Sequence, residues 1–118
     1  MKPSKAIVEA AKKNAALSQA RFKVGAVVYY KGQIIGKGYN KATKTHTLSP
    51  HPFKFIDAEF SAVIDAVVYA KGNLKHCGIY IHRLKKDSSP GLAKPCEFCS
   101  QMLSWIGIKE SDISYSVG

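Results

Sequence analysis

Two cysteines three residues apart are the first feature of this sequence that could carry out chemistry. Cys96 and Cys99 follow Pro95, and apolar side chains recur at helical spacing from Cys99 to Ile106. Because proline is favoured at the start of a helix, both sulfurs are predicted to lie on a first helical turn. Unpaired backbone N–H groups and the helix dipole favour thiolates there. Such a pair can bind a metal, take part in redox chemistry or simply be buried.

Two carboxylates stand at the start of another predicted helix, over residues 57–71. Asp57 and Glu59 lie two residues apart and precede an apolar face with helical periodicity. Two helices that each begin after a loop at the same edge of a sheet bring their N-termini together, and ligands bind in crevices of that kind. We therefore expect the carboxylates to lie opposite the thiolates.

The elements that must position these groups follow from the remaining periodicity. The predicted order is a helix over 3–18, strands over 24–30 and 33–40 that form a hairpin, a polar loop over 41–56, the helix over 57–71, a strand over 77–82, a loop over 84–94, the cysteine helix and a strand over 112–117. Helices that alternate with strands predict an α/β fold with three layers, α/β/α, and a mixed sheet. Because strand–helix–strand steps join parallel strands, the last two strands are expected to run parallel to their predecessors. No linker or repeat is visible, so residues 1–118 are predicted to form a single domain.

The charge balance is strongly basic and favours an anionic partner. The chain has 18 Lys and Arg against 8 Asp and Glu, a net charge of +10, and no acidic residue lies between Glu9 and Asp57. A positive field of this kind attracts phosphate, although a basic solvated surface is an equal alternative. Sixteen of the basic residues are lysines, which favours general attraction over sequence-specific base reading. The lysines of the 84–94 loop are candidate phosphate contacts.

The other features point to a reduced, non-membrane environment. Three cysteines would leave one over after pairing, no apolar run reaches the length of a membrane span, and the N-terminus has no signal-peptide pattern. We therefore expect a cytoplasmic protein without membrane partners. Cys77 and Trp105 are expected in the core, and His76 and His82 are expected to be surface or satisfied residues rather than ligands.

The layout of these groups resembles the zinc-dependent cytidine and deoxycytidylate deaminase superfamily, which also includes tRNA adenosine deaminases. In that family H-x-E or C-x-E opens one helix and P-C-x-x-C opens the next. This chain offers Asp57-Ala58-Glu59 and Pro95-Cys96-Glu97-Phe98-Cys99. The segment 24–28 resembles the first strand of the family, and Gly38-Tyr39-Asn40 resembles the end of its second. The resemblance therefore implies a cytidine-deaminase-like fold over most of the chain.

The resemblance also implies a reaction and a set of roles. Zn²⁺ would be held by Asp57, Cys96 and Cys99, with Glu59 as the general acid and base. Substrate contacts are implied for Asn40, which would meet the sugar, and for Ala58, Pro95 and His51. The implied reaction is hydrolytic deamination of a cytosine base to uracil, in a nucleoside, a nucleotide or single-stranded nucleic acid. Members of the superfamily are often oligomers, so a homo-oligomer is compatible with this interpretation.

One position departs from the family pattern, because Asp57 stands where His or Cys is usual. Asp57 could ligate zinc through oxygen, as carboxylates do at about 2.0–2.2 Å. It could instead be only a helix N-cap, with the metal lost or weak. In a third interpretation, His46 or His51 of the preceding loop supplies the missing ligand. The rival functions are an inactive deaminase-fold module that binds nucleic acid, an adenosine deaminase of the tRNA type, and a thioredoxin-like redox protein.

Overall fold

The computed structural model describes residues 3–18, 23–40, 62, 65, 74–95 and 97–117 of the 118-residue chain. Residues 62 and 65 are both helical and fall in the predicted helix over 57–71. The rest of that helix and the loop predicted over 41–56 lie outside the described residues.

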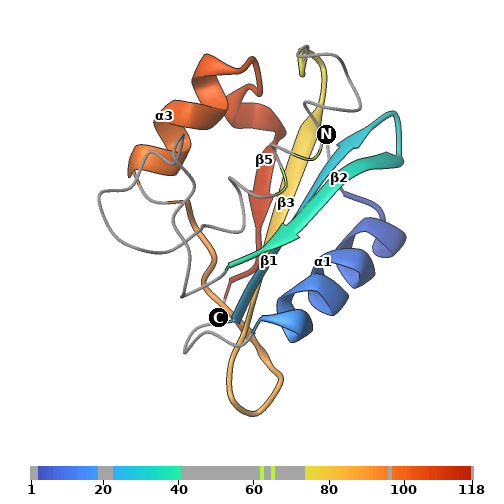
Figure 1. Ribbon diagram of the computed structural model, residues 1–118, viewed down its shortest axis with the longest axis vertical. Helices are drawn as coiled ribbons and strands as arrows, with labels where there is room; N and C mark the ends of the chain where they lie inside the picture. Colours follow the sequence, from blue (N-terminus) through green and yellow to red (C-terminus); the bar gives the residue numbers. More distant parts are fainter. Residues whose placement is uncertain are drawn as a thin grey trace.

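A five-stranded mixed sheet forms the centre of the domain (Figure 1). Its strands are β1 (Lys23–Tyr30), β2 (Gln33–Tyr39), β3 (Gly78–Leu84), β4 (Pro90–Gly91) and β5 (Ile113–Tyr115). The strand order is β2-β1-β3-β4, and β5 pairs with β3. Strand β1 is antiparallel to β2 and β3, β4 is antiparallel to β3, and β5 is parallel to β3. The predicted α/β fold with a mixed sheet is therefore confirmed.

The strand directions agree with the crossover argument. Both β2 and β3 are antiparallel to β1, so they run in the same direction, and β5 runs parallel to β3.

The short strand β4 was not expected, because it lies within the loop predicted over 84–94. It pairs only with Arg83 and Leu84 at the end of β3. The last strand is also shorter than predicted, since a 3-10 turn over Glu110–Asp112 precedes it.

The β1–β2 hairpin has the turn chemistry that its sequence requires. Lys31 and Gly32 both have positive φ angles, 49° and 79°, as in the type I′ turns whose twist matches paired strands. Val28 pairs with Gly36 and Tyr29 pairs with Ile34, so an extra residue bulges from β2 beside Gly36. A glycine within a strand often marks a bulge of this kind.

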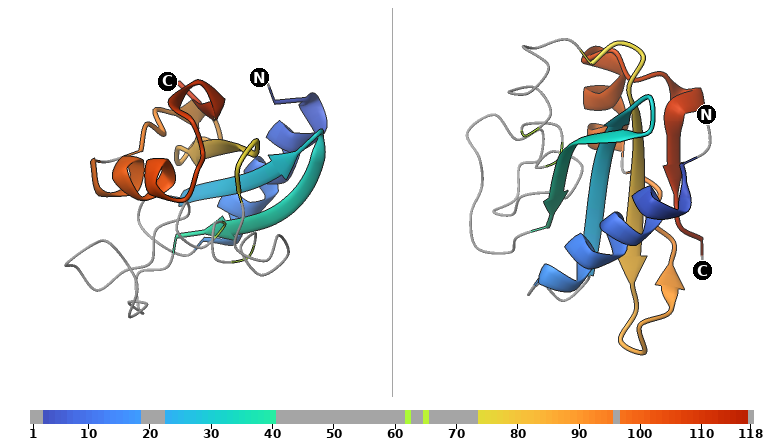
Figure 2. Two further views of the ribbon diagram at one scale, coloured as in Figure 1. Left: turned by 90° about the horizontal axis from the view of Figure 1, so that it is seen from above. Right: turned by 90° about the vertical axis from the view of Figure 1, so that its right-hand side faces the viewer.

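Helices cover both faces of the sheet (Figure 2). Helix α1 (Lys5–Leu17) is capped by Ser4, whose side chain accepts a hydrogen bond from the Ile7 backbone nitrogen at 3.4 Å. It packs against one face in a cluster of buried residues, namely Ile7, Ala11, Val27, Tyr29 and Tyr80. Helix α3 (Glu97–Trp105) supplies Leu103 to a larger cluster that also holds Ala26, Val28, Ile79 and Ile81. Residues of the two clusters alternate along β1 and β3, so the clusters lie on opposite faces of the sheet. With one helix on each face, the domain has the predicted three layers.

A left-handed glycine ends α3. Gly107 has a φ of 104°, its backbone N–H donates to the carbonyl of Ser104, and the N–H of Ile108 donates to the carbonyl of Leu103. These two bonds are those of a Schellman motif, and Ile108 and Leu103 belong to one core cluster, as the motif favours. The motif fixes how the chain leaves α3 and returns to the sheet at β5.

One packing expectation was wrong. Trp105 is 94% exposed, although a core position was expected for it. It is the last residue of α3, and its side chain lies beyond the face that carries Leu103. Leu17 is likewise 61% exposed at the end of α1. Cys77 is buried as expected, and burial raises the pKa of its thiol, so it remains a neutral core residue.

A buried histidine lies on the α1 face of the sheet. His82 is 2% exposed within β3, and its Nδ1 atom lies 3.0 Å from the Tyr80 hydroxyl. Its Nε2 atom finds no hydrogen-bond partner in the described part of the chain. Burial lowers the pKa of this imidazole, Lys12 lowers it further, and Glu9 acts in the opposite direction. His82 was expected to be a surface or satisfied residue; it is buried, and one of its two ring nitrogens has a partner among the described residues.

This histidine predicts a loss of stability at mildly acidic pH. In the unfolded chain the imidazole has a pKa of about 6.5. Because its folded-state pKa is lower, the unfolded state binds more protons below that pH. The free energy of unfolding should therefore be constant above about pH 6.5, fall as the pH drops towards the folded-state pKa, and level off below it. Urea unfolding between pH 8 and pH 5 measures the effect. A His82→Gln variant should lose this slope, whereas His76→Asn, at an exposed position, should retain it.

Candidate active site

The described part of the candidate site lies around the edge of the sheet where β2 and β3 end and β1 begins. Antiparallel pairing of β1 with both neighbours brings these ends together. Asn40 follows β2 at this edge. After β3 the chain returns alongside it through β4, and Pro95 and α3 follow. Pro95 is half-buried and lies two residues before Glu97, the first residue of α3.

Asn40 is held by hydrogen bonds from two segments of the chain, the end of α1 and the start of β1. The Val24 backbone N–H donates to its Oδ1 at 3.0 Å, and its own N–H donates to the Val24 carbonyl at 3.1 Å. The Ser18 hydroxyl lies 2.7 Å from Oδ1 and 2.9 Å from the Asn40 carbonyl oxygen. Because a backbone N–H needs an acceptor, these contacts fix which end of the carboxamide is the oxygen. The amide NH₂ is thereby the end turned away from Val24.

Ser18 is a positioning residue that the sequence did not reveal. It is buried, it follows the last residue of α1, and its backbone N–H donates to the carbonyl of Ala15. A serine at the end of a helix is ordinary, and its contact with Asn40 spans 22 residues. Only the docking of α1 on the sheet shows that this hydroxyl orients the candidate substrate contact.

Cys99 has the environment expected of a zinc ligand. Its side chain is fully buried, it lies in the first turn of α3, and it carries a thiol rather than a disulfide. Thiolates are preferred zinc ligands, and the first turn of a helix stabilises their negative charge. This residue therefore fits the metal that the P-C-x-x-C pattern implies.

The other predicted site residues lie outside the described part of the chain. These residues are Asp57, Ala58, Glu59, Cys96 and His51. Within the described residues, no three side chains of His, Cys, Asp or Glu form a cluster that could hold a metal. The assignment of these five residues, and of the roles of Asn40 and Pro95, therefore stays a prediction.

Comparison with known families gives one match over almost the whole chain. Residues 1–114 match the family model described as the cytidine and deoxycytidylate deaminase zinc-binding region. Among curated proteins, none gives a significant match to the sequence. No helix within the described ranges is long and apolar enough to cross a membrane.

Solved structures with the same fold include several deaminases. The dCMP deaminase of cyanophage S-TIM5 in its apo form has 26% sequence identity and a TM-score of 0.58, and the alignment covers 95% of this chain and 83% of that one. A cytidine deaminase from Burkholderia pseudomallei has 23% identity and a TM-score of 0.62, with 86% and 75% of the two chains covered. Guanine deaminase from Bacillus subtilis has 20% identity and a TM-score of 0.64, with 98% and 65% covered. The last two show the fold alone.

Proposed function

Because the chain belongs to the family of the cytidine and deoxycytidylate deaminase zinc-binding region, we propose that it is a zinc-dependent hydrolytic deaminase of a cytosine base. The family match over residues 1–114 carries this proposal. The 26% identity with a dCMP deaminase whose structure is known in complex with dCMP and dUMP supports the choice of cytosine. In the reaction, water replaces the exocyclic amine of the base, and cytosine and water give uracil and ammonia.

The zinc ligands in this proposal are Asp57, Cys96 and Cys99. Zinc, when bound, lowers the pKa of a coordinated water to near neutrality. The burial of Cys99 in the first turn of α3 supports its part in the ligand set. Asp57 provides an oxygen ligand in place of the more usual His or Cys.

Glu59 would move the protons of the reaction, and Asn40 would orient the substrate. A carboxylate two residues beyond the first ligand can accept a proton from water and deliver it to a ring nitrogen and to the departing ammonia. Asn40, whose Oδ1 atom is held by Val24 and Ser18, is the proposed contact for a sugar oxygen of the substrate. Ala58, Pro95 and His51 are further proposed substrate contacts.

A product assay tests the proposal directly. The zinc-loaded protein is incubated with cytidine, dCMP, adenosine, guanine and single-stranded oligonucleotides that contain cytosine or adenine, and the products are separated by chromatography. We expect uracil products and ammonia from at least one cytosine substrate. Inosine or xanthine as the only product would contradict the choice of base, and no product from any substrate would contradict the enzymatic proposal.

A further inference from the structure

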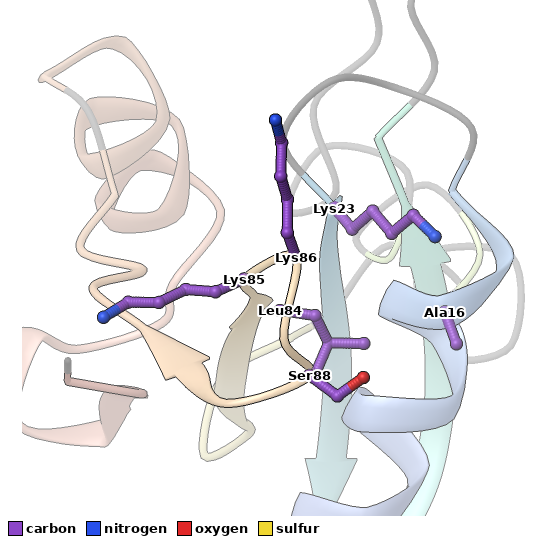
Figure 3. Close-up of a pocket in the computed structure, with 6 residues that line it drawn as sticks. All are labelled: Ala16, Lys23, Leu84, Lys85, Lys86 and Ser88. Carbon is purple, nitrogen blue, oxygen red and sulfur yellow. The ribbon is translucent and has the colours of Figure 1, made fainter.

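A pocket rimmed by lysines lies at the same edge of the sheet, on the side of α1 (Figure 3). Its volume is about 300 Å³, and its lining residues come from the end of α1, the start of β1, the end of β3 and the hairpin that joins β3 to β4. These residues are Ala16, Lys23, Leu84, Lys85, Lys86 and Ser88. Lys23 adjoins Val24, whose backbone holds Asn40, so the pocket is next to the candidate substrate contact.

The hairpin that carries two of the lysines has a defined conformation. The Lys85 N–H donates to the Ser89 carbonyl at 2.9 Å, the Ser88 N–H donates to the Lys85 carbonyl at 2.9 Å, and Ser88 has a φ of 68°. This is the three-residue loop in which a turn is followed by a left-handed residue. Lys86 is therefore held at the tip of the hairpin, with Lys85 where it leaves the sheet.

Asp87, the acidic residue of this hairpin, is hydrogen-bonded to Ser89. The Asp87 carboxylate accepts hydrogen bonds from the Ser89 backbone nitrogen at 3.0 Å and from the Ser89 hydroxyl at 2.5 Å. These bonds, and the nearby Lys85, lower the pKa of Asp87, so it remains ionised. It offsets part of the charge of the lysines but does not line the pocket. The charged side chains that line the pocket are therefore all lysines.

The directions of the three lysines distinguish between two kinds of anion. In Figure 3, the side chains of Lys23, Lys85 and Lys86 extend in three different directions, and that of Lys85 points away from Ala16 and α1. A clamp for one phosphate would need its ammonium groups to converge on a point, usually with a bidentate arginine. Charges spread around a concave edge instead suit a strand whose phosphates follow one another. All three lysines are exposed, as contacts with such a strand require.

We propose that this pocket binds the phosphate backbone of single-stranded nucleic acid, with Lys23, Lys85 and Lys86 each neutralising one phosphate. The proposal deepens the proposed function, since a strand on this edge makes cytosine within a polynucleotide the substrate. The catalytic part of the proposal rests on the proposed deaminase activity, whereas the binding of a strand does not depend on that activity. Oligothymidylate contains no base that the proposed reaction consumes, so its binding can be measured independently of turnover.

The test is the salt dependence of oligothymidylate binding, followed by fluorescence anisotropy. For single strands the logarithm of the binding constant falls with the logarithm of the salt concentration, by about 0.7 for each neutralised phosphate. Each variant Lys23→Gln, Lys85→Gln or Lys86→Gln should reduce the slope by about 0.7, and the triple variant should reduce it by about 2. Circular dichroism should show that these exposed substitutions leave the fold unchanged.

A charge-matched variant separates a local site from the general field. Lys5, Lys31 and Lys109 are exposed residues outside the pocket, so their triple replacement by glutamine removes the same charge. This variant should keep a slope close to that of the wild type. An equal reduction in both triple variants would overturn the proposal. It would also be overturned if thymidine monophosphate or inorganic phosphate bound as tightly as the oligonucleotide and lost that binding in the pocket variant, because the pocket would then hold a single phosphate.

Discussion

A Glu59→Gln variant is expected to lose deaminase activity by about 10²–10⁴-fold while it retains zinc and stability. Glutamine has the size of glutamate but cannot accept a proton from water at neutral pH and pass it to a ring nitrogen. Because a residue of this kind does not itself bind the metal, the ligand set is unchanged. The rate is measured with the substrate that gives the highest turnover in the product assay, and zinc is measured in the same preparation.

The matched control for this variant is Glu97→Gln. Glu97 is an exposed carboxylate in the first turn of α3, between the two cysteines in sequence, so the substitution removes the same charge from the same region. It should change the rate by less than about tenfold, as expected for a group that transfers no proton. If both variants kept the wild-type rate, Glu59 would not be the general acid and base.

A Gly25→Ala variant is expected to lower the free energy of unfolding by about 3 kcal/mol or more. A Cβ atom at Gly25 would lie 2.3 Å from the carbonyl oxygen of Ala11 and 2.4 Å from the backbone nitrogen of Ala15. Both contacts are with the backbone of α1, so the helix as a whole must move away from the sheet. Ser18 follows α1, and its displacement should loosen the hydrogen bonds that hold Asn40. Urea unfolding measures the first effect, and a higher KM at a similar kcat would report the second.

Gly91→Ala provides the comparison for the same chemical change. A Cβ atom there would meet the side chain of Arg83 at 3.0 Å, and a flexible side chain can shift where a helix backbone cannot. We expect a cost below about 1 kcal/mol at this position. An equal loss of unfolding free energy in the two variants would contradict the close contact between Gly25 and the backbone of α1.

The sequence predicts the order of the elements well because each element carries its own local signal. The Ser4 cap begins α1, the Lys31-Gly32 turn joins two apolar strands, and Gly107 ends α3. The direction of β5 follows from the general geometry of crossovers. Strand β4 has no such signal, because it consists of two residues that pair only where the chain turns back after β3.

The side-chain environments are predicted less well because they depend on contacts between distant segments. Trp105 is expected in the core, but it stands two residues from Leu103, on a different face of α3, and its ring is exposed. His82 looks like a residue at the end of a strand, yet α1 covers it. The contact between Ser18 and Asn40 joins residues 22 positions apart, and no local pattern reports it.

The measurement that tests the central claim most directly is the zinc content of purified wild-type, Asp57→His and Asp57→Ala proteins, determined by mass spectrometry of the metal. If Asp57, Cys96 and Cys99 hold the ion, the wild type and Asp57→His should contain zinc in stoichiometric amounts, and Asp57→Ala should lose most of it. Full zinc occupancy in Asp57→Ala would contradict the claim, because Asp57 would then not be a ligand of the metal.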